Sequence, residues 1–204
     1  MTVITPVFGS AGREILFYVG SRGHHADIGG ITPGSMPPNS RVVEEEGVLI
    51  DNFLLVENGR LREKETVALL SSGPYPARNV EQNMADLHAM IAANEKGAQE
   101  LQRMVSTFGL EVVHAYMRHV QDNAEEAVRR VIEVLKEGEF SYEMDNGATI
   151  RVRIAIDRKA RSAVLDFTGT SPQLPSNFNA PPAVCRRSSP TITAASSSGA
   201  RQMG

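Results

Sequence analysis

Apolar residues recur every three or four positions through the middle of the chain, a spacing that places them on one face of a helix. Asn79 and Gln82 resemble a capping box, and the Thr107-Phe108-Gly109 break predicts the end of that helix. A second stripe follows and stops at Gly138, although Asp122 could begin a new helix within it. The stripes comprise Val80, Met84, Leu87, Ile91, Ala98, Leu101 and Val105, then Val113, Tyr116, Met117, Val120, Ala124, Val128, Val131 and Leu135. We expect a helical hairpin whose stripes pack on each other or on a sheet.

Period-two alternation on both sides of this helical region predicts β-strands. Residues 148–156 alternate strongly, and residues 163–167 return after a charged turn, as in an antiparallel meander. Near the amino terminus, residues 3–8 and 15–19 flank a glycine-rich turn, and residues 48–50 and 53–56 read as further short strands. The expected fold class is α+β: short antiparallel strands and a glycine-rich loop, a helical hairpin, then a β-meander, forming an incomplete domain.

Composition narrows the class of protein. The 204 residues are 41% hydrophobic and 22% charged, which suffices for one or two small lobes with a core. The net charge of -3 is interspersed, so we expect no nucleic-acid surface, and no apolar run is long enough for a membrane span. A single cysteine, Cys185, and the lack of a leader favour a cytoplasmic location. Residues 185–204 lack periodicity and are expected to be disordered.

The segment 23–30 carries the strongest candidate chemistry, because two imidazoles and a carboxylate lie within four residues and glycines flank them. His24, His25 and Asp27 together suit a divalent ion such as zinc, manganese or iron, or a proton transfer. These ligands do not complete a site, and a surface loop is an equally good interpretation. Asp166, at the end of a predicted strand, could bind a ligand or satisfy a turn.

Five separated blocks resemble the hydantoinase B / 5-oxoprolinase family. They are His24-His25-Ala26-Asp27-Ile28-Gly29-Gly30, Pro33-Gly34-Ser35-Met36-Pro37-Pro38, residues 78–94, Asp166-Phe167-Thr168-Gly169-Thr170-Ser171 and Asn177-Phe178-Asn179-Ala180-Pro181. Their order and spacing are alike over residues 2–184. The resemblance implies ring opening of a cyclic amide, such as 5-oxoproline or a hydantoin, coupled to ATP hydrolysis in a hydantoinase A type partner subunit or domain. ATP would be used by that partner and not bound here, in a hetero-oligomer.

Related acetone carboxylases resemble the same subunit and hold manganese there, so the resemblance implies a divalent metal, manganese or zinc. It makes His24 the leading ligand, with His25 and Asp27 as further metal candidates. Asp27 and Asp166 are the predicted catalytic residues, Asp27 as a base or as the group that orients an imidazole. We expect the ring of His24 to face a cavity.

Two departures from the family pattern limit the expected activity. Members carry Gly-x-His-x-x-Asp immediately before the strand that begins here at Thr2, and Met1 stands in its place. Beyond residue 184 the family continues into a long folded region, whereas residues 185–204 have no recognisable pattern. Residues 1–184 are therefore expected to form a domain fragment that is impaired alone, and residues 185–204 a frame-shifted or truncated tail. The alternatives are an acetone-carboxylase-like carboxylase subunit and a noncatalytic assembly subunit.

Overall fold

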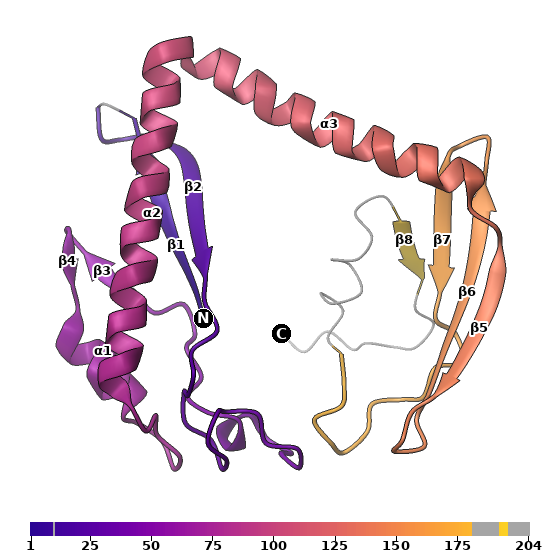
Figure 1. Cartoon of the computed structure of the whole chain (residues 1–204), viewed down its shortest axis with the longest axis horizontal. Helices are drawn as coiled ribbons and strands as arrows, with labels where there is room; N and C mark the ends of the chain where they lie inside the picture. Colours follow the sequence, from indigo (N-terminus) through magenta and orange to yellow (C-terminus); the bar gives the residue numbers. More distant parts are fainter. Residues whose placement is uncertain (10, 181–191, 196–204) are drawn as a thin grey trace. The chain divides into compact units, whose positions relative to one another are not determined.

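The computed structural model describes residues 1–9, 11–180 and 192–195 (Figure 1). The chain divides into two compact units, Met1–Leu110 and Glu111–Gly204, and each is described by itself. Within the described residues, no helix is both long and apolar enough to cross a membrane.

The first unit opens with a two-stranded antiparallel hairpin, as predicted. Strand β1 (Thr2–Phe8) pairs with β2 (Ile15–Arg22) in a register that sets Val7 opposite Phe17, and both of these side chains are buried. A second, very short hairpin joins β3 (Val56–Glu57) to β4 (Arg60–Leu61) through the expected Asn-Gly turn. No strand forms at the predicted residues 48–50, which follow a short 3-10 helix (Val43–Glu45), and of the strand predicted at residues 53–56 only Val56 lies in β3.

Two helices complete the first unit. Helix α1 (Glu63–Leu70) is not predicted by the sequence pattern, because it is short and its N-terminal residue provides no side-chain cap. Helix α2 (Val80–Phe108) begins where expected, with the side chain of Asn79 accepting a hydrogen bond from the Gln82 amide at 3.1 Å. It ends before Gly109, whose φ of 84° suits glycine.

Helix α2 packs on the β1–β2 hairpin, so its apolar stripe is buried on a sheet. The core cluster comprises Leu70, Ala77, Met84, Leu87 and Met90, with Met1, Val3, Leu55, Leu61 and Val80 packed around it. Asn94 is buried in the same interface and donates to the Val3 carbonyl and to Thr5 Oγ1, both at 3.0 Å. These bonds satisfy a polar side chain that burial would otherwise make costly.

The second unit contains helix α3 and a four-stranded sheet. Helix α3 (Leu110–Val134) runs continuously through Asp122, so no new helix begins there. The sheet order is β5 (Gly138–Glu143), β6 (Thr149–Asp157), β7 (Ser162–Asp166) and β8 (Ile192–Ala195). Strands β5 to β7 form the antiparallel meander, which confirms that prediction and adds β5 to it. Strand β8 pairs parallel to β7.

The sequence analysis does not predict β5, because this strand begins directly at the predicted helix stop; residues 139–143 alternate polar and aromatic, but every residue of β5 is exposed. Strand β8 lies in the segment 185–204, for which we predict disorder. The other residues of that segment lie outside the described residues, so the prediction of a disordered, frame-shifted tail stays a prediction. The predicted helical hairpin spans both units, and each of its helices is described with its own unit.

Arginines fasten the carboxyl-terminal half of α3 to the β6–β7 turn. Arg129 donates to the carbonyls of Ala160 and Arg161, each at 3.2 Å. Arg161 forms ion pairs with Glu126 at 2.8 Å and Glu133 at 2.7 Å. Hydrogen bonds from the guanidinium groups of Arg161 and, to a smaller extent, Arg130 lower the pKa of Glu126 to about 2.

Candidate functional site

The glycine-rich loop after β2 is held in shape by the carboxylate of Asp27. Asp27 Oδ1 accepts hydrogen bonds from the amides of Gly29 (2.8 Å) and Arg78 (3.2 Å). Asp27 Oδ2 accepts from the Gly34 amide (3.1 Å) and from Arg78 Nη1 (2.7 Å). Arg78 Nη2 also donates to the Gly30 carbonyl at 2.6 Å. Arg78, which precedes the N-cap of α2, therefore fixes the loop to the start of that helix.

Ser35 closes the Pro-Gly-Ser run back onto the same loop. Its Oγ accepts from the Ile28 amide at 2.7 Å and donates to the Gly29 carbonyl at 2.6 Å. Both loop blocks that resemble the family therefore form one hydrogen-bonded unit.

Two adjacent glycines allow the loop to touch neighbouring backbone. Gly29 has a φ of 95°, and a Cβ there would lie 2.1 Å from the Tyr75 carbonyl oxygen. Gly30 has a φ of 90°, and its Cβ would lie 2.8 Å from the Glu45 carbonyl oxygen. No side chain fits at these distances, so both positions require glycine for space as well as for conformation.

His25 is the buried imidazole of the loop, with 1% of its side chain exposed. Its Nδ1 lies 3.2 Å from Asn83 Nδ2, which also donates to the Asp27 carbonyl at 2.8 Å, and 3.5 Å from Asp86 Oδ2. Its Nε2 and Asn83 Oδ1 are buried without a hydrogen-bond partner. Burial and the nearby amino terminus lower the pKa of His25 despite the opposing effect of Asp86, so the ring is neutral at pH 7.

His24 is exposed, although it is the next residue along the chain. The expectation that its ring faces a cavity is therefore not met within the described part of the chain. No group of three or more His, Cys, Asp or Glu residues is arranged to hold a metal ion there either. The structure thus separates the two imidazoles, with one in the protein interior and one in solvent.

The surroundings of the Asp27 carboxylate are not those of a general base. Burial raises the pKa of its carboxyl, but the hydrogen bonds from Gly29, Arg78 and Gly34 outweigh that effect and lower it. A carboxylate with four donors and a lowered pKa is a weak proton acceptor. This environment favours the role that orients neighbouring groups over the role of a general base.

Asp166, the other predicted catalytic residue, lies at the end of β7 in the second unit. Its Oδ1 accepts from the Thr168 amide at 2.9 Å and from Thr168 Oγ1 at 2.5 Å. These bonds lower the pKa of Asp166. The geometry is that of a side chain closing a turn over its own backbone.

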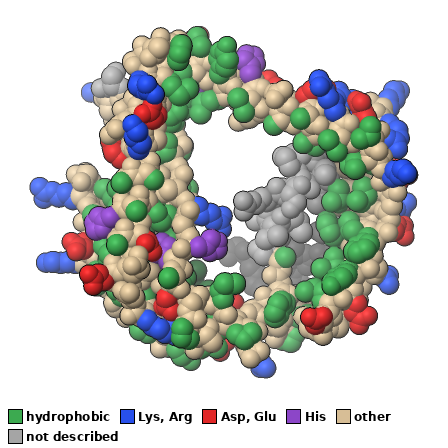
Figure 2. Space-filling model, in the orientation of Figure 1, with side chains coloured by type: hydrophobic (Ala, Val, Ile, Leu, Met, Phe, Trp, Pro, Cys, Tyr) green, Lys and Arg blue, Asp and Glu red, His purple; other side chains and the backbone are tan. Residues whose placement is uncertain are grey.

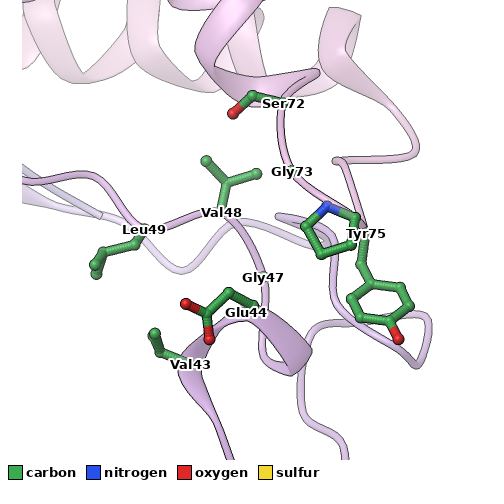
Figure 3. A pocket seen from close by; sticks show the side chains of 9 residues that line it. Val43, Glu44, Gly47, Val48, Leu49, Ser72, Gly73 and Tyr75 are labelled. Carbon is green, nitrogen blue, oxygen red and sulfur yellow. The ribbon is translucent and has the colours of Figure 1, made fainter.

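A small pocket borders the glycine-rich loop in the first unit (Figure 3). Its walls come from residues 43, 44, 47–49 and 72–75, with Glu44 as its one carboxylate, and its volume is about 120 Å³. The Gly30 amide donates to the Tyr75 carbonyl at 3.0 Å, which ties one wall to the loop. Ligand pockets usually measure roughly 300 to 1,000 Å³, so this one is too small for a substrate-sized molecule.

Sequence reasoning missed the residues that organise the site. Arg78 and Asn83 lie 51 and 56 residues from Asp27 along the chain and reach it only in the fold. The available signal was the position of Arg78 directly before a predicted helix cap, where a side chain can turn toward a preceding loop.

Comparisons with known proteins place this fold in a family. The family described as hydantoinase B/oxoprolinase matches residues 1–196. A 5-oxoprolinase from Dictyostelium discoideum is 41% identical over 196 residues, covering 90% of this chain and 15% of the relative. A 5-oxoprolinase from Saccharomyces cerevisiae is 40% identical over 196 residues, with the same coverage of both chains.

A solved structure is similar as well. The crystal structure of the ATP-dependent caprolactamase from Pseudomonas jessenii matches with a TM-score of 0.69 and 25% identity, covering 88% of this chain and 31% of that chain. This chain spans about 15% of the length of the two 5-oxoprolinases. With its family match, its sequence identity and its shared fold, the chain belongs to the hydantoinase B/oxoprolinase family.

Proposed function

We propose that this chain supplies part of the hydrolysis site of an ATP-dependent enzyme that opens cyclic amides, with 5-oxoproline as the candidate substrate. The names of its relatives support this, because 5-oxoprolinases and a caprolactamase both point to lactam rings. The structural observation that carries it is the loop that Asp27 and Arg78 hold rigid while His24 stays exposed.

His24 is the proposed chemical group of the loop. Opening a lactam adds water to the carbonyl carbon and a proton to the ring nitrogen, and an imidazole can transfer such protons near neutral pH. Asp27 positions His24 by fixing the backbone of the loop, and Asn83 anchors the neighbouring His25 to α2. Asp166 remains a proposed catalytic residue, and its turn supports a positioning role.

The predicted manganese or zinc ion does not fit the residues of this chain by themselves. Both oxygens of Asp27 are occupied by N–H donors, and His24 and His25 differ in burial. We expect weak or absent metal binding when the chain is dialysed and its metal content measured. Stoichiometric metal that disappears in His24→Ala would contradict this expectation.

ATP enters the proposal through a partner. The chain has no P-loop, so a hydantoinase A type subunit or domain is proposed to use ATP, in a hetero-oligomer with this chain. The ATP dependence in the name of the caprolactamase supports such a coupling.

The test uses the 5-oxoprolinase of Dictyostelium discoideum as a complete relative. Changing its residue matched by His24 to alanine should lower kcat for lactam hydrolysis by roughly 100-fold or more, the usual contribution of a proton-transfer group. Changing the residue matched by His119, which lies on exposed surface of α3, is the control and should leave turnover unchanged. Unchanged turnover in the His24 variant, with the partner still bound, would favour a noncatalytic assembly subunit. Bicarbonate-dependent consumption of a ketone would favour a carboxylase.

A further inference from the structure

The sheet of the second unit carries a groove that is larger than the pocket beside the glycine-rich loop. Its volume is about 370 Å³, within the range of roughly 300 to 1,000 Å³ that is usual for ligand pockets. Its walls come from β5, β6, the end of β7 and the turn that follows, all in the same unit. In Figure 2, hydrophobic side chains gather over one face of this sheet, and basic and acidic side chains lie along its edge.

Two arginines at alternate positions of β6 line this groove and have different neighbours. Arg153 lies between two carboxylates, because its ladder partners are Glu139 on β5 and Asp166 on β7, and its Nε lies 3.6 Å from Glu139 Oε1. Arg151 has Ser141 as its partner on β5, and it forms no ion pair within the described residues. Two carboxylates against one guanidinium leave the row around Arg153 negative, whereas the row around Arg151 is positive.

The turn after β7 packs against Arg151. Gly169 has a φ of 90°, and a Cβ there would lie 3.1 Å from Arg151 Cδ and 3.6 Å from Arg151 Nη1, so the arginine side chain lies across this glycine. Thr170 Oγ1 accepts a hydrogen bond from the Arg151 amide at 3.0 Å and donates to the Arg151 carbonyl at 2.9 Å. The turn belongs to the block 166–171 that resembles the family, and it therefore holds the backbone of Arg151 and supports its side chain.

We propose that this groove binds a small zwitterion, an amino acid with a carboxylate and an ammonium group. Arg151 donates parallel N–H bonds to the carboxylate of the ligand, a geometry to which the planar guanidinium is suited. The excess negative charge of Glu139 and Asp166 attracts the ammonium group. Arg151 and Arg153 are two strand positions apart, roughly 6.6 Å along β6, a separation that a small amino acid spans with one hydrogen bond at each end.

Lactam hydrolysis is the reaction that supplies such a ligand, and this part of the inference rests on the proposed function. Hydrolysis breaks the C–N bond of the ring and leaves a carboxylate and an amine, protonated near pH 7, in one molecule. An amino acid is therefore the product whichever lactam is opened. The ring nitrogen of the substrate is an uncharged amide, so the negative row of the groove favours the product over the substrate.

An NMR titration of the full chain tests the groove. L-Glutamate is added to ¹⁵N-labelled protein, and binding is followed at the backbone amides of residues 168–170 and at the Nε–H of Arg151. Glutarate, which is L-glutamate without the amino group, and inorganic phosphate are the comparison ligands. We expect saturable shifts with L-glutamate and binding of glutarate and phosphate that is about 3-fold weaker or more, because neither carries an ammonium group.

Four variants assign the binding to the named groups. Arg151→Gln should weaken L-glutamate binding about 10-fold, and Arg151→Lys, which keeps the charge without the planar fork, should weaken it less. Glu139→Gln should weaken the binding of L-glutamate but not that of glutarate. Arg130→Gln is the matched control, because Arg130 pairs with Glu126 on exposed surface of α3 outside the groove and should leave binding unchanged.

The proposal is overturned if L-glutamate gives no saturable shift at these amides, or if glutarate or phosphate binds as tightly, which would show an anion site without selectivity for amino acids. Native binding in a folded Arg151→Gln chain also overturns it. If the amide spectrum shows that this variant does not fold, native affinity in both Arg151→Lys and Glu139→Gln overturns it instead. These measurements concern binding to this chain, so they can fail while the turnover test of His24 succeeds, and the reverse.

Discussion

Replacing Asp27 by alanine removes the acceptor on which the glycine-rich loop is built. Four donors lose their partner: the amides of Gly29, Gly34 and Arg78, and the Arg78 guanidinium. The loop then has to find water for these groups or change its path. We expect the loop to open and the first unit to lose stability.

The magnitude follows from burial. The side chain of Asp27 is only 13% exposed, so its bonds to backbone amides are charge-assisted and partly shielded, worth about 1.5 to 3 kcal/mol each before water replaces some of them. Arg78 is 41% exposed, which limits its ion pair to about 0 to 1 kcal/mol. We expect Asp27→Ala to lower the free energy of unfolding by about 2 to 4 kcal/mol. Arg78→Met keeps the three amide bonds and should cost about 1 kcal/mol.

Urea unfolding followed by circular dichroism measures these changes, and hydrogen exchange of the Gly29 and Gly34 amides reports the loop directly. Arg103→Met is the control, because Arg103 pairs with Glu100 on exposed surface of α2 and should leave the midpoint unchanged. The reasoning fails if Arg78→Met destabilises more than Asp27→Ala. It also fails if the two glycine amides exchange as fast in the native chain as in the Asp27 variant.

The remaining predictions concern space and pH. Gly29→Ala should destabilise by about 3 kcal/mol or more, because its Cβ meets the carbonyl of Tyr75, whereas Gly12→Ala, with a similar φ and open space, should cost about 1 kcal/mol in the same urea assay. Stability should fall as pH drops below about 7, since the folded state lowers the pKa of His25 and the unfolded state binds more protons. It should fall again below about pH 4, as Asp27 and Glu126, whose pKa values are both lowered in the folded state, become protonated. Urea midpoints from pH 3 to 8 test both windows. His25→Gln should shrink the first window and leave the second, because the amino terminus of Met1, whose pKa burial also lowers, still contributes to the first; an unchanged first window would contradict the assignment.

Local chemistry made much of this fold predictable from sequence. The cap at Asn79, the turn before β4 and the alternation in β6 each depend on residues only a few positions apart. Helix α1 escaped prediction because it is only eight residues long and its N-cap residue makes no side-chain bond, and β5 because all of its residues are exposed.

Local sequence patterns predicted only part of the candidate site. The motif drew attention to His24, His25 and Asp27, because residue type and glycine content are visible in the sequence. It could not show which imidazole is buried, because the burial of His25 depends on Asn83, 58 residues further along the chain.

The two helical stripes show the same division. The sequence by itself determined that α2 and α3 are amphipathic helices, since periodicity is a property of the chain alone. Only the tertiary structure decided that Met84 and Leu87 of the α2 stripe are buried in the core while Val120 and Val131 of the α3 stripe are exposed. An apolar face on a helix shows that burying it would be favourable. Which surface covers that face depends on contacts between segments that are distant in the sequence.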